Sequence, residues 1–184
     1  MRVISGKFRG KRLFAPADNR IRPTTDRIKE SVFNILSSRR AVEGARVLDL
    51  FSGTGALGIE ALSRGASEVI FVDIDRDSLE LTRRNLLHVK ADAAAWRTYH
   101  AEYKTALKKL EGQAFDLIFI DPPYSAVPKI DCIEIIGQSN ILSKTGLIVF
   151  EHSAKNSLHY LEGQYIIDSR NMGDTQISFI SLRE

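Results

Sequence analysis

Two stretches of this sequence combine residue types that could act on a small planar group. The first is Asp121-Pro122-Pro123-Tyr124, which directly follows the apolar run 115–120. Consecutive prolines cannot continue a strand ladder, so this loop is expected to be rigid, with carbonyl groups that need donors elsewhere. Asp121 and a proline carbonyl could accept both N–H groups of an aromatic amine while Tyr124 stacks on its ring. These four candidate catalytic residues predict a site that orients a flat exocyclic amine.

The second stretch is a glycine-rich turn between an apolar segment and a helical pattern. Gly53 and Gly55 allow the backbone to bend sharply and to approach a ligand. The helix expected from Ala56 would direct its free amide groups back into this turn. The spacing of Gly53, Gly55 and Gly58 alone equally suits a dinucleotide-binding fold. The turn therefore predicts a cofactor site without identifying the cofactor.

Acidic residues at the ends of two strands narrow the choice of cofactor. Asp73 follows the apolar run 68–72, where a carboxylate can accept hydrogen bonds from both hydroxyls of a ribose. Asp49 precedes the glycines, where it would repel a pyrophosphate but attract the ammonium of a methionine moiety. This favours S-adenosylmethionine, with an NAD-dependent oxidoreductase as the alternative. The candidate cofactor-binding residues are Asp49, Ser52, Gly53, Thr54, Gly55, Asp73, Ile74, Glu102 and Asp121.

From residue 46 onward the hydrophobic pattern alternates between strand and helix, which is typical of an α/β fold with a mostly parallel sheet. We expect strands at 47–50, 68–72, 96–100, 115–120 and 146–150, helices at 56–64, 76–89, 103–110 and 129–136, and an antiparallel pair at 165–168 and 176–182. Glu102 follows the third strand and could contact an adenine ring, because ligands lie beyond the carboxyl ends of such strands. A first-turn acid favoured by the helix dipole is the alternative interpretation.

The N-terminal part of the chain differs from the remainder in charge. Residues 1–40 contain eleven basic and three acidic residues, a net charge of +8, whereas the other 144 residues carry −5. Such an asymmetry favours contact with a polyanion, most plausibly nucleic acid; a merely solvated basic face is the alternative. The candidate RNA-binding residues are Arg9, Lys11, Arg12, Arg20, Arg22 and Arg27.

Residues 1–40 are expected to form a basic ribbon and helix that extend a domain at 41–184. Residues 1–16 alternate apolar and basic residues around two glycines, which predicts a small β-hairpin. Thr24 or Thr25 caps a helix that continues to about residue 38 and leaves Arg27, Lys29 and Glu30 toward solvent or ligand.

Several features exclude other classes of protein. With 184 residues and 43% hydrophobic residues, the chain suits one domain, or one domain with a small appendage, with a sizeable core. No apolar run approaches the length of a membrane span and no secretory signal precedes the domain, so a cytoplasmic protein is expected. The single cysteine, Cys132, has no nearby metal-ligand partners and is interpreted as packing, and His152 as structural. We expect no metal.

With these motifs assembled, the chain resembles the RsmD family of bacterial 16S ribosomal RNA guanine-N2 methyltransferases along nearly its whole length. The resemblance depends on four blocks, which are Arg2–Gly6 with Phe8–Leu13, Arg22–Arg27 with Glu30 and Phe33-Asn34, Asp49–Ala66, and Asp121–Tyr124. It implies a Rossmann-like class I S-adenosylmethionine-dependent methyltransferase fold with a seven-stranded sheet. The implied reaction is methylation of the exocyclic N2 of one guanine, guanine 966, in 16S RNA of the small ribosomal subunit or its assembly intermediate. We expect a monomer.

The chain departs from the family pattern in two places, and its motifs also suit other functions. The family often has glutamate where this chain has Asp73, and residues 91–103, which include Glu102, match poorly. The same loop at Asp121 could orient the amine of adenine N6 or of a protein glutamine, so the choice of guanine rests on the resemblance. A catalytically silent RNA-binding protein is the remaining alternative.

Overall fold

The computed structural model describes residues 1–16, 26–122, 131–154, 158, 161–173 and 175–183. Its helices are α1 (Asp26–Ser38), α2 (Ala56–Ser63), α3 (Arg76–Val89), the 3₁₀ helix η1 (Ala93–Ala95), α4 (Tyr103–Lys109) and α5 (Asp131–Gln138). Its strands are β1 (Arg46–Asp49), β2 (Glu68–Asp73), β3 (Trp96–His100), β4 (Phe115–Ile120), β5 (Leu142–Ser153), β6 (Tyr165–Met172) and β7 (Thr175–Leu182).

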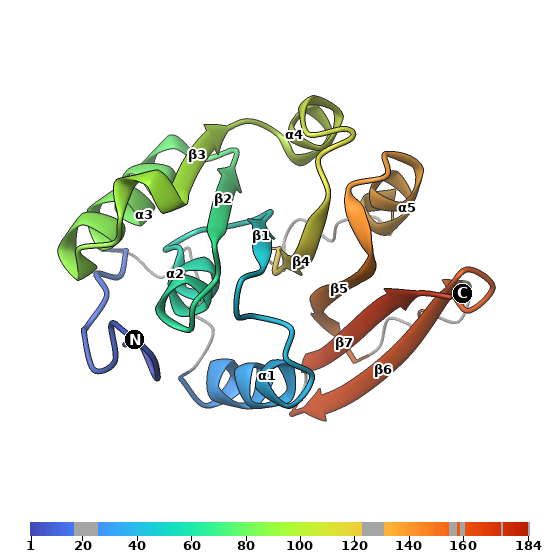
Figure 1. The fold of residues 1–184 in the computed structure, drawn as a ribbon, viewed down its shortest axis with the longest axis horizontal. Coiled ribbons are helices and arrows are strands. Elements are labelled where there is room, and N and C mark those ends of the chain that lie inside the picture. Colours follow the sequence, from blue (N-terminus) through green and yellow to red (C-terminus); the bar gives the residue numbers. More distant parts are fainter. Residues whose placement is uncertain (17–25, 123–130, 155–157, 159–160, 174, 184) are drawn as a thin grey trace.

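The strands form one seven-stranded sheet in the order β3-β2-β1-β4-β5-β7-β6 (Figure 1). All pairs from β3 to β5 are parallel, and β7 pairs antiparallel with both β5 and β6. The predicted α/β class, the parallel sheet and the closing antiparallel pair are therefore confirmed. The order of the strands reverses between β1 and β4, because β2 and β3 lie on one side of β1, and β4 and β5 lie on the other. Ligands of such folds bind at that point, beyond the carboxyl ends of the strands.

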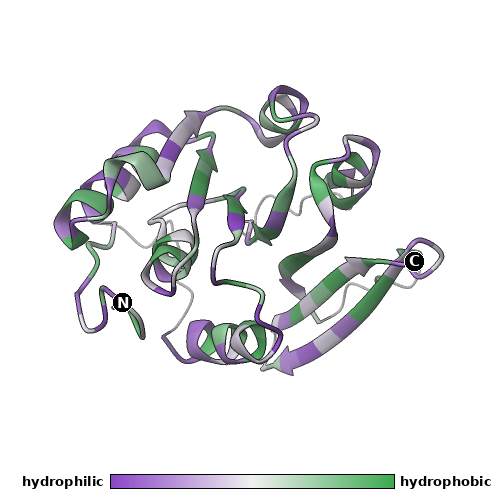
Figure 2. Cartoon of the chain, in the orientation of Figure 1, coloured by the Kyte–Doolittle hydropathy of each residue, from purple (hydrophilic) through white to green (hydrophobic). Residues whose placement is uncertain are grey.

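Helices cover both faces of the sheet, with α1, α2 and α3 on one face and α4 and α5 on the other (Figure 1). Each face has its own cluster of buried side chains. Figure 2 shows why the layers form, because the central strands are mostly hydrophobic whereas α3 alternates between hydrophobic and hydrophilic residues. An amphipathic helix of this kind buries one stripe against a sheet and leaves the other in water.

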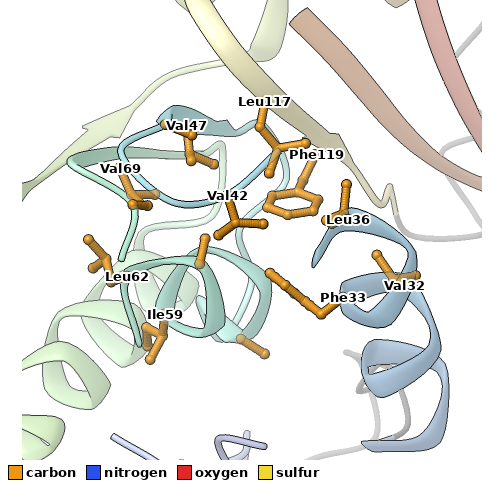
Figure 3. Packing of buried hydrophobic residues seen from close by; sticks show 14 of the residues in the cluster. Val32, Phe33, Leu36, Val42, Val47, Ile59, Leu62, Val69, Leu117 and Phe119 are labelled. Carbon is orange, nitrogen blue, oxygen red and sulfur yellow. The ribbon is translucent and has the colours of Figure 1, made fainter. Parts of the chain in front are cut away.

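The cluster beneath α1 and α2 joins the N-terminal part of the chain to the sheet (Figure 3). Phe33 of α1 is fully buried, and its ring centroid lies 5.7 Å from that of Phe119 in β4. Val3, Phe8 and Leu13 belong to the same cluster. Burying each such side chain contributes about 1.5–3 kcal/mol, so residues 1–16 stabilise the sheet domain directly. Whether the chain divides functionally at residue 40 stays a prediction.

The N-terminal segment forms the small hairpin that was expected, whereas one residue of α1 differs from expectation. Arg2 and Arg12 form an antiparallel bridge, and the amides of Val3 and Leu13 donate to the carbonyls of Lys11 and Met1 at 2.9 and 3.2 Å. Lys29, which was expected to face solvent or ligand, is completely buried, whereas Arg27 and Glu30 are exposed as predicted. The fold tolerates this buried ammonium because it has two partners. Its Nζ lies 3.5 Å from Oε2 of Glu60 on α2 and donates to the carbonyl of Arg2 at 2.6 Å. The expected helix cap at residue 24 or 25 lies outside the described residues.

Among the described residues, none of the helices is both long enough and apolar enough to span a bilayer.

Candidate active site

The glycine loop between β1 and α2 has a left-handed backbone at two positions. Gly53 has φ +52° and Gly55 has φ +76°, a region that favours glycine. A Cβ at residue 55 would also lie 2.9 Å from Cγ2 of Thr82. The amide of Gly55 donates to the carbonyl of Ser52 at 2.7 Å, which closes the turn. The sequence therefore adopts this tight turn because both positions lack a side chain.

Asp73, at the end of β2, fixes the glycine loop through its carboxylate. Its Oδ2 accepts the amide of Gly53 at 2.8 Å, and its Oδ1 accepts the amide of Asp75 at 2.9 Å. Burial raises the pKa of Asp73 above its ordinary value, and these backbone donors oppose that rise. A carboxylate oxygen can accept more than one hydrogen bond, so Asp73 retains acceptor capacity for ribose hydroxyls.

Asp49 is a buried carboxylate at the end of β1. Its Oδ2 accepts the amide of Gly58, in the first turn of α2, at 3.0 Å. Burial raises the pKa of Asp49 to about 7, the negative charges of Asp121 and Asp73 add to that rise, and the Gly58 amide opposes it. A bound group of positive charge would relieve both the desolvation and the repulsion. The site thus fits the cationic end of S-adenosylmethionine.

A second observation supports the fit to a polar ligand. The hydroxyl of Ser52 is buried, and it has no hydrogen-bond partner among the described residues. Buried hydroxyls almost always have a partner, so this one is suited to a polar group of a bound molecule. Ser52 was among the predicted cofactor-binding residues, and it lies between Asp49 and the glycines as expected.

The predicted adenine contacts lie at the same edge of the sheet. Ile74 directly follows Asp73 and is 66% exposed, which is unusual for a large apolar side chain. Its carbonyl accepts a hydrogen bond from Nε2 of His100, the last residue of β3, at 2.9 Å. Glu102 is the N-cap residue of α4 and makes no side-chain capping bond there. The N-terminal end of α4 is also the position that the alternative interpretation, an acid favoured by the helix dipole, requires.

The loop after β4 meets the glycine loop at this edge. Asp49 pairs in register with Phe119, and the amide of Leu50 donates to the carbonyl of Phe119 at 3.1 Å. Asp121 follows two residues later, is half-buried, and is close enough for its charge to raise the pKa of Asp49. Pro122 is also half-buried. The predicted catalytic residues Pro123 and Tyr124 lie outside the described residues.

The predicted RNA-binding residues are only partly on one surface. Arg9, Arg12 and Arg27 are exposed, whereas Nζ of Lys11 donates to the carbonyl of Val89 at 2.8 Å and so serves the C-terminus of α3. Arg20 and Arg22 lie outside the described residues.

A depression of about 410 Å³ brings Arg9 and Arg27 together with Arg2, which the sequence interpretation did not include. Asp26 and Glu30 also line it, and Nε of Arg2 lies 3.7 Å from the Asp26 carboxylate. Three guanidinium groups around one depression could hold a phosphate, since arginine binds phosphate in a bidentate manner.

Sequence reasoning also missed two residues of α3 that hold the glycine loop. Oγ1 of Thr82 donates to the carbonyl of Gly53, and Nδ2 of Asn85 donates to the carbonyl of Thr54, both at 2.9 Å. Both residues lie on the buried stripe of α3, where their polarity is the one signal that sets them apart from core residues.

Comparison with known proteins identifies the family. The family described as conserved hypothetical protein 95 matches residues 1–181 of this chain. Ribosomal RNA small subunit methyltransferase D of Escherichia coli (strain K12) is 34% identical over 158 residues, which cover 86% of this chain and 77% of the relative. The chain belongs to the RsmD family.

Two further similarities extend over nearly the whole chain. YlbH of Bacillus subtilis (strain 168) is 39% identical over 169 residues, covering 91% of this chain and 90% of YlbH. The solved structure of YhhF from Escherichia coli has a TM-score of 0.87 at 28% identity and covers 100% of this chain and 98% of that one. The resemblance inferred from the sequence motifs is thereby confirmed, together with the methyltransferase fold.

Proposed function

We propose that this RsmD-family chain transfers the methyl group of S-adenosylmethionine to the exocyclic N2 of a guanine in small-subunit ribosomal RNA. The finer assignment is guanine 966 of 16S RNA, and the substrate is the small subunit or its assembly intermediate. The observation that carries this proposal is the meeting of three carboxylates at one edge of the sheet, where the charges of Asp73 and Asp121 both act on Asp49. The name of the Escherichia coli relative supports the class of substrate.

The cofactor would occupy the edge formed by the ends of β1, β2 and β3. Asp49 would lie near its positively charged methionine end, Asp73 would accept the ribose hydroxyls, and Ile74 would cover the adenine. Glu102 is the proposed polar contact to the adenine. When bound, S-adenosylmethionine supplies a methyl group activated by a sulfonium.

The helix that follows the glycine loop argues against a dinucleotide. Dinucleotide-binding folds place the pyrophosphate against free amides at this helix N-terminus. Here the amide of Gly58 already donates to Asp49, so the protein's own carboxylate occupies part of that position. A pyrophosphate would lie against a buried negative charge, which is unfavourable.

Asp121, which is also among the residues proposed to bind the cofactor, would orient the amine. Its carboxylate accepts one N–H of guanine N2 and the Pro122 carbonyl accepts the other, which holds the nitrogen lone pair toward the methyl group. Positive charge develops on N2 during transfer, and the neighbouring carboxylate stabilises it. Tyr124 would replace the stacking that the base loses on leaving the RNA, and Pro123 completes the proposed set of catalytic residues. Arg9, Arg12 and Arg27 hold the RNA phosphates from the N-terminal side.

A methyl-transfer assay tests this proposal. Small ribosomal subunits from cells lacking the protein are incubated with labelled S-adenosylmethionine, and the modified nucleotide is mapped. We expect N2-methylguanine at a single position with the wild-type protein. Asp121→Ala should abolish transfer while binding of S-adenosylhomocysteine stays largely intact.

A matched control for this assay is available on the same strand. Asp116→Asn changes an exposed carboxylate near the opposite end of β4, where it accepts the amide of Arg46, and should leave transfer unchanged. Full activity of Asp121→Ala, or label on an adenine or a protein, would overturn the proposal.

A further inference from the structure

The N-terminal segment, residues 1–16, is bound to both helices that flank the glycine loop. On α2, the carboxylate of Glu60 accepts the amides of Ile4 and Ser5 at 2.8 and 3.0 Å. The amide of Phe8 donates to Oγ of Ser63 at 2.8 Å. Because α2 begins directly after the glycine loop, this part of the segment is fixed to the helix that leaves the cofactor site.

The other end of the segment is bound to α3. The amide of Phe14 donates to Oδ1 of Asn85 at 2.7 Å, and Nδ2 of Asn85 donates to the carbonyl of Phe14 at 3.1 Å. Cζ of Arg84 lies 3.9 Å from the centroid of the Phe14 ring. The centroids of the Phe14 and His88 rings are 4.9 Å apart. Phe14 is therefore held by its backbone and by its side chain.

Asn85 connects this segment to the cofactor loop itself. Its side chain is completely buried, and the same Nδ2 that bonds Phe14 also donates to the carbonyl of Thr54. A side-chain amide has two N–H donors and one carbonyl acceptor, so the donors and the acceptor of Asn85 are all used. One side chain thus joins residue 14 to residue 54.

The bond to Thr54 fixes the orientation of a peptide group in the turn. The carbonyl of Thr54 and the amide of Gly55 belong to one planar peptide unit. Glycine on both sides of Thr54 gives this unit little intrinsic restraint. A donor at the Thr54 carbonyl therefore also orients the Gly55 amide, which closes the turn onto Ser52.

We propose that Asn85 is a positioning residue for the cofactor loop, and that the loop reaches its binding geometry only while the N-terminal segment is docked on α3. This inference rests on the proposed function, because it assumes that the loop binds S-adenosylmethionine. It also links the two substrates, since the segment that carries Arg9 and Arg12 toward RNA is the one that restrains the loop. Such coupling is reciprocal, so RNA held by the segment strengthens cofactor binding, and the cofactor strengthens RNA binding.

Three variants of the full chain test this inference. Asn85→Ala removes the link, and Phe14→Ala loosens the segment while Asn85 keeps its bond to Thr54. Leu87→Ala, at a side chain of α3 that is 68% exposed, is the matched control. The measurements are calorimetric titration with S-adenosylhomocysteine, the KM for S-adenosylmethionine with kcat at saturation, and the melting temperature.

We expect the Kd for S-adenosylhomocysteine to rise about tenfold or more in Asn85→Ala and about fivefold in Phe14→Ala. KM for S-adenosylmethionine should rise in parallel while kcat at saturation stays within about twofold, because the loop is displaced but Asp121 is not. Loss of stability alone would lower the melting temperature and leave Kd and KM unchanged.

An unchanged Kd in Phe14→Ala would overturn the inference, and this variant remains informative if Asn85→Ala does not fold. A wild-type chain that does not bind S-adenosylhomocysteine would instead contradict the proposed function, so the two failures are distinguishable.

Discussion

Two buried carboxylates, Asp49 at the end of β1 and Glu60 within α2, have very different surroundings. Asp49 is 2% exposed and Glu60 is fully buried. Glu60 accepts the amides of Ile4 and Ser5, and its oxygens lie 3.5 Å from Nζ of Lys29 and 2.8 Å from Nε of Arg64. Asp49 accepts the amide of Gly58, and the charges that act on it are those of Asp73 and Asp121.

The difference separates a structural group from a chemical one. A buried charge is tolerated when cations and donors surround it, and Glu60 meets that condition within the chain itself. Within the part of the chain that the structure describes, Asp49 does not meet that condition, and burial raises the pKa of Asp49 to about 7. Equal burial therefore does not imply equal roles. The undercompensated carboxylate is the one expected to receive a positively charged ligand.

The largest expected effect is the loss of Glu60. Glu60→Ala leaves the ammonium of Lys29 buried without its carboxylate and removes the acceptor for two backbone amides. We expect the free energy of unfolding to fall by about 3–5 kcal/mol, measured by urea denaturation. Asp168→Ala, which breaks exposed ion pairs with Arg39 and Arg170, should cost less than about 1 kcal/mol. Equal losses of unfolding free energy in Glu60→Ala and Asp168→Ala would contradict the structural role assigned to Glu60.

Asp49 should make the stability of the folded protein depend on pH. Its folded pKa of about 7 lies above the ordinary 3.8, so between these values the folded state binds a proton that the unfolded state does not. The cofactor-free protein should therefore lose stability as pH rises through this window, by a few kcal/mol, and the loss should level off above about pH 7.

Asp49→Asn isolates this contribution, because asparagine keeps an acceptor for the Gly58 amide and carries no charge. Urea denaturation at about pH 5 and pH 8 should show a difference in stability between wild type and variant that favours the variant at the higher pH. The raised pKa of Asp73 acts in the same direction and remains in both proteins. A difference that does not change with pH would show that Asp49 is already compensated.

A smaller effect is expected at Gly58, whose amide is the donor to Asp49. A Cβ at this position would lie 2.3 Å from Cε1 of Phe71, so α2 must move away from β2 to accommodate it. Gly58→Ala should cost about 1–3 kcal/mol, measured as a fall in melting temperature. Gly163→Ala is the control, because nothing lies within 4 Å of a Cβ there. If the two variants melt alike, close packing of α2 on the sheet is not what selects glycine.

The sequence predicted the parts of the molecule that depend on local pattern. The strands of the parallel sheet and the positions of Asp49, Asp73 and Asp121 at their ends follow from hydrophobic periodicity and turn chemistry. The small hairpin expected within residues 1–16 is present, with Arg2 bridged to Arg12. The bonds from the residues between its two arms to Glu60 and Ser63 of α2 could not be predicted from local pattern, because these acceptors lie far away in the sequence.

The environments of Lys29 and Asn85 could not be predicted in the same way. The apolar residues at helical spacing, Ile28, Val32, Ile35 and Leu36, predict a buried stripe that leaves Lys29 toward solvent. The buried residues of α1 are instead Lys29, Val32, Phe33 and Leu36. The burial of Lys29 depends on Glu60, which comes from another helix 31 residues away. Asn85 likewise acquires its role from residues 14 and 54, which only the tertiary structure brings together.

The most direct test of this account is a calorimetric titration of the wild-type chain and Asp49→Asn with S-adenosylhomocysteine and with NAD. We predict that the wild type binds S-adenosylhomocysteine and not NAD, and that the variant, although folded, binds S-adenosylhomocysteine at least about tenfold more weakly because the charge that receives the ammonium is gone. Binding of NAD by the wild type, or equal affinity for S-adenosylhomocysteine in the two proteins, would contradict the role assigned to Asp49.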